Sequence, residues 1–280
     1  MIYTNKLNLP EIFVNCVKPK EEKPLVINKF SVTELLGSTR EIVLKRRFRD
    51  KIEVDVSDSI AALLGTALHE YLEKNAPEGG KTELSMELQF GKDIVSGRCD
   101  LLLNDELIDY KTTTTTKVMK NDFEDWKHQG LIYSYMALML FDIKVKRLKF
   151  HILMKDWSKL KSVYSSSYPQ SPIFTWIYEV QDSDYDYIRK YILNKLRDIH
   201  EAEINLPECT NEEKWYTGTK YAVYRKAGDK KAAAVCDSEE DAHKYISEKC
   251  NGAGEIQVRK GEYLKCKYYC DCCKFCERND

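Results

Sequence analysis

The hydrophobic positions of this chain change their period along its length. Between residues 57 and 75 apolar side chains recur every three or four positions, which predicts an amphipathic helix. Residues 81–90 alternate between apolar and polar, as in a half-buried strand. The pattern then predicts a hairpin at residues 97–111 and a helix that is apolar nearly all round at residues 121–141. Strands are predicted at residues 146–156 and 173–180, and an amphipathic helix at residues 183–205. This order predicts an α/β fold in which helices flank a mixed central sheet.

The predicted hairpin carries an unusual set of charges. Its two apolar runs flank Asn104-Asp105, which reads as a two-residue turn. Counting outward from that turn places Asp100 opposite Asp109 and Arg98 opposite Lys111. Directly opposed side chains share one face with Cβ atoms about 4.5–5.5 Å apart, so the two carboxylates should repel each other unless a cation lies between them. We therefore expect a divalent cation at this hairpin.

Composition narrows the class of protein. The chain has 280 residues, 43% of them hydrophobic and 32% charged, as in folded globular proteins. A net charge of −1 excludes a globally basic nucleic-acid binder, although the basic clusters at residues 45–49 and 144–149 could contact phosphates or simply be solvated. The start shows no signal-peptide pattern, and the longest apolar run, residues 131–141, is too short for a span of about 20 residues. We expect a cytoplasmic protein without a membrane partner.

Cysteine density marks the C-terminal end. The chain has ten cysteines, and five of them fall between Cys266 and Cys276. In a reducing cytoplasm this density favours metal or redox chemistry over disulfides. Cys270, Cys273 and Cys276 alone already have a plausible metal-ligand spacing.

The chain divides by composition into four segments. We expect an N-terminal lead-in whose short helices pack on the core, the core itself, a small ββα insertion and a cysteine-rich metal-binding tail, at residues 1–56, 57–205, 206–262 and 263–280. No Gly-x-x-x-x-Gly-Lys-Ser/Thr phosphate loop occurs, so an ATP-driven motor would have to be another protein.

Several residues gain meaning only as a set. Taken alone, a histidine on an apolar helix or a glutamine four residues before a tyrosine is ordinary packing. In order, however, the chain carries Gly65-Thr66-Ala67-Leu68-His69-Glu70, Gly97-Arg98-Cys99-Asp100, Asp109-Tyr110-Lys111-Thr112 and Gln129-x-x-x-Tyr133. Over residues 57–155 this set resembles the PD-(D/E)xK nuclease superfamily, in its RecB-like branch. The resemblance implies a restriction-endonuclease-like core.

The resemblance also implies metal ligands. Asp100 and Asp109 would coordinate a catalytic Mg²⁺ or Mn²⁺, with the backbone carbonyl of Tyr110 as a further oxygen ligand. His69 would be an additional ligand on the same or a second metal, which favours Mn²⁺ because imidazole is a poor partner for Mg²⁺.

Three further residues receive roles by the same resemblance. Lys111 would position the attacking water or stabilise the charge that builds on the phosphorane. Gln129 and Tyr133 would hold either a DNA phosphate or the head of Lys111 in place. Arg98 is not a signature of the family, and a phosphate contact and charge balance are equally open for it.

The tail has a resemblance of its own. Cys209, Cys266, Cys270 and Cys276 resemble the four-cysteine iron–sulfur clip of some RecB-like nucleases, such as the AddB type and the CRISPR-associated exonucleases, which implies a [4Fe–4S] cluster with Zn²⁺ as the alternative. In those families one cysteine precedes the nuclease motifs, whereas Cys209 follows them. The fourth ligand therefore stays open among Cys209, Cys16, Cys272 and Cys273.

These residues lead to a functional hypothesis. The first hypothesis is that the protein is a metal-dependent DNA nuclease. We expect an exonuclease of recombination or repair rather than a site-specific enzyme, since no sequence-reading module is evident. DNA is the expected partner, with a helicase, recombinase or single-strand annealing protein in trans. The alternatives are a non-catalytic DNA-binding or scaffold subunit with a nuclease fold, and a zinc-ribbon-type module on an unrelated enzyme.

Overall fold

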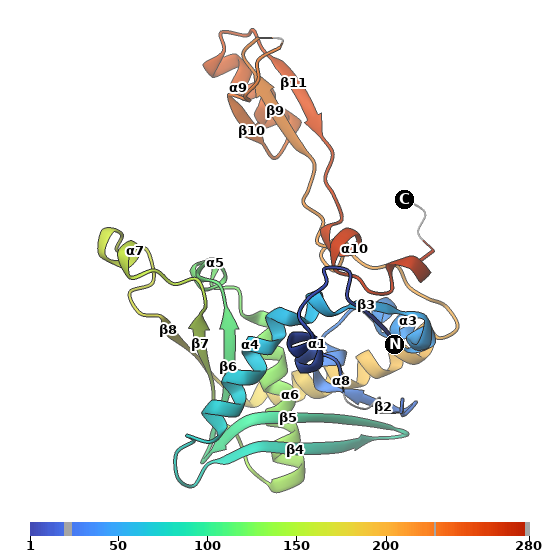
Figure 1. The fold of residues 1–280 in the computed structure, drawn as a ribbon. Coiled ribbons are helices and arrows are strands. Elements are labelled where there is room, and N and C mark those ends of the chain that lie inside the picture. Colours follow the sequence, from blue (N-terminus) through green and yellow to red (C-terminus); the bar gives the residue numbers. More distant parts are fainter. Residues whose placement is uncertain (20–23, 227, 278–280) are drawn as a thin grey trace. The chain divides into compact units, whose positions relative to one another are not determined.

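The structure, a computed structural model, describes residues 1–19, 24–226 and 228–277 (Figure 1). Residues 20–23 of the expected lead-in, residue 227 of the expected insertion and residues 278–280 of the expected tail lie outside this part. The chain splits into two compact units, Met1–Leu206 and Pro207–Asp280. Within the described residues, we find no helix with the length and apolar character needed to cross a membrane.

The first unit is built on a six-stranded mixed sheet with the order β2-β5-β6-β7-β8, and β4 pairs with β5. The β4–β5, β5–β6 and β7–β8 pairs are antiparallel, whereas β2–β5 and β6–β7 are parallel. The strands are β2 (Lys29–Ser31), β4 (Lys81–Phe90), β5 (Asp93–Leu103), β6 (Glu106–Thr113), β7 (Arg147–Met154) and β8 (Ile173–Glu179). The expected α/β fold with a mixed central sheet is confirmed.

Helices flank this sheet (Figure 1). The long helix that the sequence predicts as apolar nearly all round packs on strands β4 to β7 and on α8, and its middle turns, residues 130–137, are buried. The helices are α1 (Glu11–Val17), α2 (Val32–Leu35), α3 (Thr39–Arg47), α4 (Val56–Glu73), α5 (Thr115–Lys120), α6 (Glu124–Phe141), α7 (Lys159–Tyr164) and α8 (Asp182–Ala202), with a 3₁₀ turn at Arg49–Lys51. A small parallel pair joins β1 (Ile2–Thr4) to β3 (Glu53–Asp55).

Two strands share one edge of β5. β6 pairs with Leu101–Leu103, and β2 pairs with Ile94–Ser96, which leaves four residues between the two ladders. In this gap a Cβ atom on Gly97 would lie 2.6 Å from Cε1 of Tyr133 and 2.7 Å from Cγ2 of Val32. Both neighbours are buried, so a larger residue has no room. The motif that begins at Gly97 therefore marks the place where β6 leaves β5.

The second unit contains a three-stranded antiparallel sheet with β9 in the middle. One helix covers this sheet through a small core of Val223, Ala242 and Ile246. The elements are β9 (Lys220–Tyr224), β10 (Ala234–Cys236), α9 (Glu239–Lys249), β11 (Glu255–Arg259), α10 (Leu264–Tyr268) and a 3₁₀ turn at Cys273–Phe275. The sequence predicts two strands and a helix here, and the structure adds β11, which pairs with all of β9. With two apolar residues, β11 is too short for periodicity to reveal it.

The gap between the two ladders gives a stability prediction. We expect Gly97→Ala to lower the free energy of unfolding by about 1–3 kcal/mol, because the new methyl group overpacks against the ring of Tyr133. Gly65→Ala is the matched control: it lies within α4, its Cβ would meet Thr112 Oγ1 at an ordinary 3.6 Å, and it should raise stability by up to about 1 kcal/mol. Urea unfolding of both variants measures the difference, and equal effects would contradict this packing.

Candidate active site

Asp109 is a buried carboxylate on β6, with 3% of its surface exposed. Its Oδ2 lies 2.6 Å from Nζ of Lys111, a close contact between opposite charges. Among the described residues no further partner of this oxygen is found. Burial raises the pKa of Asp109, the charge of Lys111 opposes that rise, and the nearby Asp100 adds to it. Lys111 is therefore the group that compensates this buried carboxylate.

The head of Lys111 is fixed by a chain of polar contacts from α6. Lys111 Nζ donates a hydrogen bond of 2.9 Å to Oε1 of Gln129. Gln129 and the backbone amide of Arg98 also lie close to the hydroxyl of Tyr133, one helical turn further on, where both act to lower its pKa. Burial is the main cause that raises the pKa of Tyr133 to about 12, so the hydroxyl stays protonated. The structure thus brings Lys111, Gln129 and Tyr133 into one network.

Asp100 stands where the β5–β6 ladder ends. The ladder runs from Leu103–Glu106 to Leu101–Ile108, which confirms the expected register of the Asn104-Asp105 turn. One rung further, at the position of Asp100 and Asp109, the backbones no longer pair. Instead, Oδ2 of Asp100 accepts a 2.7 Å hydrogen bond from the amide of Tyr110. The two carboxylates therefore flank the fork between the strands.

His69 reaches the same fork from α4. Its Nε2 donates a hydrogen bond of 2.7 Å to the carbonyl oxygen of Tyr110, and its Nδ1 lies 3.4 Å from Oδ1 of Asp100. The hydrogen-bonding carboxylate of Asp100 is the main cause that raises the pKa of His69. Two residues that the sequence predicts as metal ligands, His69 and Tyr110, are thus already joined, and the Tyr110 carbonyl keeps a second lone pair.

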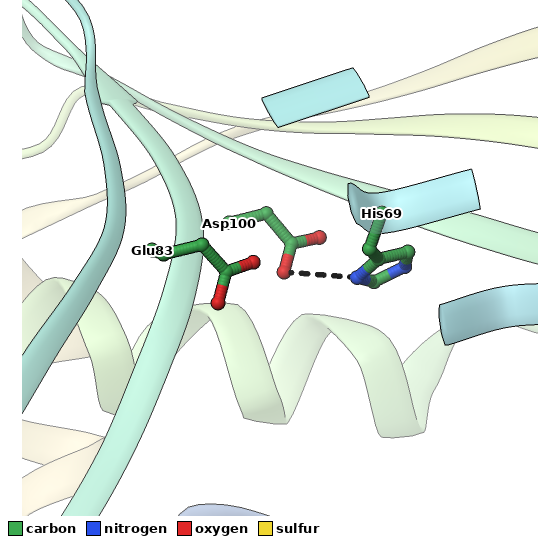
Figure 2. Close-up of side chains that lie close together, drawn as sticks. All are labelled: His69, Glu83 and Asp100. Carbon is green, nitrogen blue, oxygen red and sulfur yellow. Dashed lines mark ion pairs between the residues drawn. The ribbon is translucent and has the colours of Figure 1, made fainter. Parts of the chain in front are cut away.

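Glu83 is a site residue that the sequence analysis missed. Figure 2 shows its carboxylate beside Asp100 and His69, and the three residues offer ligand atoms that lie within 4.8 Å of one another. They help to line a cavity of about 280 Å³. One signal was available: the two-residue turn Gly91-Lys92 pairs Phe90 with Asp93, and counting outward from it places Glu83 opposite Asp100.

The rung that contains Glu83 and Asp100 is irregular. The β4–β5 ladder pairs Thr82 with Leu101 and Leu84 with Cys99 but skips this rung, and Glu83 has a φ of +46°. For a residue with a Cβ atom, this left-handed conformation costs about 1–2 kcal/mol. Cys99 and Leu102 belong to the same core cluster although they are three positions apart, so the alternation of β5 breaks here. At this break, the side chains of Glu83 and Asp100 depart from the regular pleat of the two strands.

The expectation that Arg98 lies beside Lys111 is wrong. Arg98 pairs across the ladder with Ser85 of β4, and its Nε lies 2.5 Å from Oε2 of Glu83. The reason is the fork itself: β6 has left β5 before the chain reaches Lys111, so the two residues are no longer opposed. The side chain of Arg98 is 64% exposed, whereas that of Lys111 is mostly buried.

Comparisons with known proteins find similar solved structures. No protein-family model matches the sequence, and no curated protein matches it. Among solved structures, SSO0001 is similar, with 17% identity over 74% of this chain and 90% of that chain and a TM-score of 0.47. A phage-related exonuclease from Haemophilus somnus 129PT has 13% identity over 62% of this chain and 94% of that chain, with a TM-score of 0.40. An alkaline exonuclease from Laribacter hongkongensis has 12% identity over 69% of this chain and 93% of that chain, with a TM-score of 0.38. The chain itself is a mixed α/β protein with an acidic cluster at a strand fork.

The polar network on α6 gives a second prediction. Tyr133→Phe keeps the ring but removes the buried hydroxyl that lies close to Gln129 and the Arg98 amide, so we expect the free energy of unfolding to fall by about 1–3 kcal/mol. Tyr135→Phe is the control, because that ring stacks on Phe90 and no hydrogen bond of its hydroxyl is found among the described residues. Denaturant unfolding compares the two, and an unchanged midpoint in Tyr133→Phe would refute the network.

Proposed function

We propose that this protein is a metal-dependent DNA nuclease that hydrolyses phosphodiester bonds. The observation that carries the proposal is the buried carboxylate of Asp109 beside Lys111, at the fork that Asp100 and His69 also reach. A carboxylate of this kind suits a divalent cation, and an ammonium group beside it suits a phosphodiester. The likeness of the four sequence motifs to the PD-(D/E)xK superfamily, in its RecB-like branch, supports the same reading.

The donor set fits Mg²⁺ or Mn²⁺. Asp100 and Asp109 would supply carboxylate oxygens, and Tyr110 would supply a backbone carbonyl, all of them hard oxygen ligands. His69 would contribute from α4, and its imidazole favours Mn²⁺. When bound, such a cation lowers the pKa of a coordinated water and neutralises charge on the phosphoryl oxygens.

The protein residues provide the positioning. Lys111 holds a positive charge beside Asp109, where it can orient the attacking water or stabilise the charge that develops on the phosphoryl group. Gln129 accepts from Lys111, so we assign Gln129 and Tyr133 to holding the lysine head rather than to binding a phosphate directly. This network holds Lys111 independently of its ion pair with Asp109.

We assign the activity to an exonuclease of recombination or repair. Two of the similar solved structures are named exonucleases, and the chain offers no evident sequence-reading module. A net charge of −1 provides little general affinity for DNA, so a helicase, recombinase or single-strand annealing protein in trans would supply processivity.

We also propose that Cys209, Cys266, Cys270 and Cys276 hold a structural [4Fe–4S] cluster, with Zn²⁺ as the alternative. All four lie in the second unit, and backbone contacts tie the segment after Cys209 to the segment before Cys266: Tyr216 bridges to Tyr263, and Leu264 bonds to Trp215. These ties favour Cys209 as the upstream ligand. Cys272 remains a competitor, because it is buried and its sulfur lies 3.5 Å from that of Cys270.

Cleavage of end-labelled DNA tests the proposed function. We expect the wild type to release nucleotides with Mg²⁺ or Mn²⁺ but not in a chelator, and Asp109→Asn or Lys111→Met to slow cleavage about 100- to 1,000-fold. Lys149→Met is the control: this lysine lies on the next strand, pairs with Glu106 and should not affect the rate. DNA binding without cleavage by any divalent ion would favour the scaffold alternative instead.

The cysteine assignment has its own test. Anaerobic purification should yield a brown protein with the absorption of an iron–sulfur cluster, and Cys266→Ser should lose both the colour and the bound iron. Cys236→Ser, on β10 of the same unit, should keep them. If the wild type contains zinc without iron, the alternative metal is correct. If it contains no iron and no zinc, the proposed four-cysteine site is contradicted.

A further inference from the structure

The small sheet of the second unit has one covered face and one open face. On the covered face, Val223 of β9 packs with Ala242 of α9. Because side chains alternate along a strand, Tyr224 points to the other face. Val235 of β10 pairs with Ala222, lies on that same face as Tyr224 and is 53% exposed. The face opposite α9 is therefore accessible to a ligand.

Two planar side chains lie across this open face. Arg259 of β11 pairs with Lys220 at the start of β9, four positions before Tyr224, so it belongs to the same face. Its Nη2 donates a hydrogen bond of 2.8 Å to the hydroxyl of Tyr224. Ala222, which lies between the two rungs, is fully buried although α9 packs on the other face. A tyrosine ring and a guanidinium group of this kind can each stack on a nucleobase.

The loop that joins β9 to β10 gathers positive charge. Arg225, Lys226, Lys230 and Lys231 are all exposed, and no ion pair of these four cations is found among the described residues. The carboxylate of the same loop, Asp229, accepts a 3.1 Å hydrogen bond from the backbone amide of Lys226. The acidic residues of the unit gather elsewhere, with three of them in the first turn of α9. The charge of this loop is therefore complementary to a phosphate backbone.

We propose that the open face and the β9–β10 loop together bind single-stranded DNA. The loop cations contact the phosphates, while bases stack on Tyr224 and on the guanidinium of Arg259. A duplex fits poorly, because its bases stack on one another and cannot present their faces to a flat sheet. The choice of DNA rests on the proposed function. The inference adds the strandedness of the substrate and assigns DNA affinity to the second unit.

The salt dependence of binding tests the loop. Fluorescence anisotropy of an end-labelled single strand, measured with the full chain in a chelator, gives the affinity at several salt concentrations without cleavage. The test variant changes the four loop cations to alanine: Arg225→Ala, Lys226→Ala, Lys230→Ala and Lys231→Ala. We expect the slope of log affinity against log salt to become shallower by about 2–3, because each phosphate contact on a single strand contributes about 0.7.

The matched control for the loop removes cations from α9. Lys244→Ala combined with Lys249→Ala takes away two exposed lysines of the same unit, on the helix that packs against the covered face. This variant should keep the affinity and the salt slope of the wild type. An unchanged slope in the loop variant, or an equal decrease in the α9 variant, would overturn the assignment to the loop.

The open face is tested by removing the ring of Tyr224. Tyr224→Ala should weaken single-strand binding about 10-fold and leave the salt slope unchanged, because the lost contact is a stacking contact without charge. Tyr224→Phe keeps the ring and should bind like the wild type. If circular dichroism shows that Tyr224→Ala is poorly folded, Tyr224→Leu replaces it, since leucine still covers Ala222. Wild-type affinity in a folded variant without the ring would overturn the stacking.

The choice of ligand has its own controls. A duplex of the same sequence should bind at least about 10-fold more weakly than the single strand, since its bases are not free to stack on Tyr224. Equal or tighter binding of the duplex would overturn the preference for single strands. Tighter binding of an RNA strand of the same sequence would overturn the choice of DNA.

The outcomes separate this inference from the proposed function. Metal-dependent cleavage by the wild type, together with unchanged binding in the loop and ring variants, would overturn the surface and leave the nuclease proposal standing. Binding that both variants weaken, without cleavage by any divalent ion, would support the surface and contradict the nuclease proposal. Neither binding nor cleavage by the wild type would overturn both.

Discussion

The hydrogen bond from the Tyr110 amide to the Asp100 carboxylate is the contact on which the site depends. It stands where the next rung of the β5–β6 ladder would be, so a side chain replaces a backbone acceptor at the fork. Without it, the Tyr110 amide would have no protein acceptor at the end of the ladder. A buried amide without an acceptor lowers the stability of the folded state. The same bond fixes a carboxylate beside Asp109 and holds Tyr110 so that its carbonyl meets His69.

The core and the site are built from the same residues. Tyr133 belongs to the buried cluster and packs over Gly97, and its hydroxyl lies close to the Arg98 amide, at the edge of β5 that β6 has left. Gln129, on the same helix α6, bonds to Lys111, so the position of α6 helps to fix the head of Lys111 beside the acidic cluster. A change in packing near Gly97 should therefore reach the position of Lys111, because protein interiors transmit strain.

Local sequence rules predicted much of this arrangement. A two-residue turn at Asn104-Asp105 sets register by counting, and the structure keeps that register as far as Leu101–Ile108. The point at which two strands part cannot be found by such counting, because it depends on side chains of α6 and α2 that fill the gap from elsewhere in the chain. Arg98 was misplaced for that reason. Glu83 was read as the polar side of an alternating strand, although counting from the turn at Gly91-Lys92 would have placed it opposite Asp100.

The charges at the fork form two unequal pairs. Asp109 faces Lys111, and Glu83 faces Arg98, while Asp100 contacts only the Tyr110 amide and His69 among the described residues. Three carboxylates thus meet two permanent cations, and the hydrogen-bonding carboxylate of Asp100, with the charge of Asp109 adding to it, raises the pKa of His69. The two cations also differ in restraint. Lys111 is mostly buried and is held by Gln129, whereas the side chain of Arg98 is 64% exposed. The fold therefore places one restrained and one exposed positive charge at the same acidic fork.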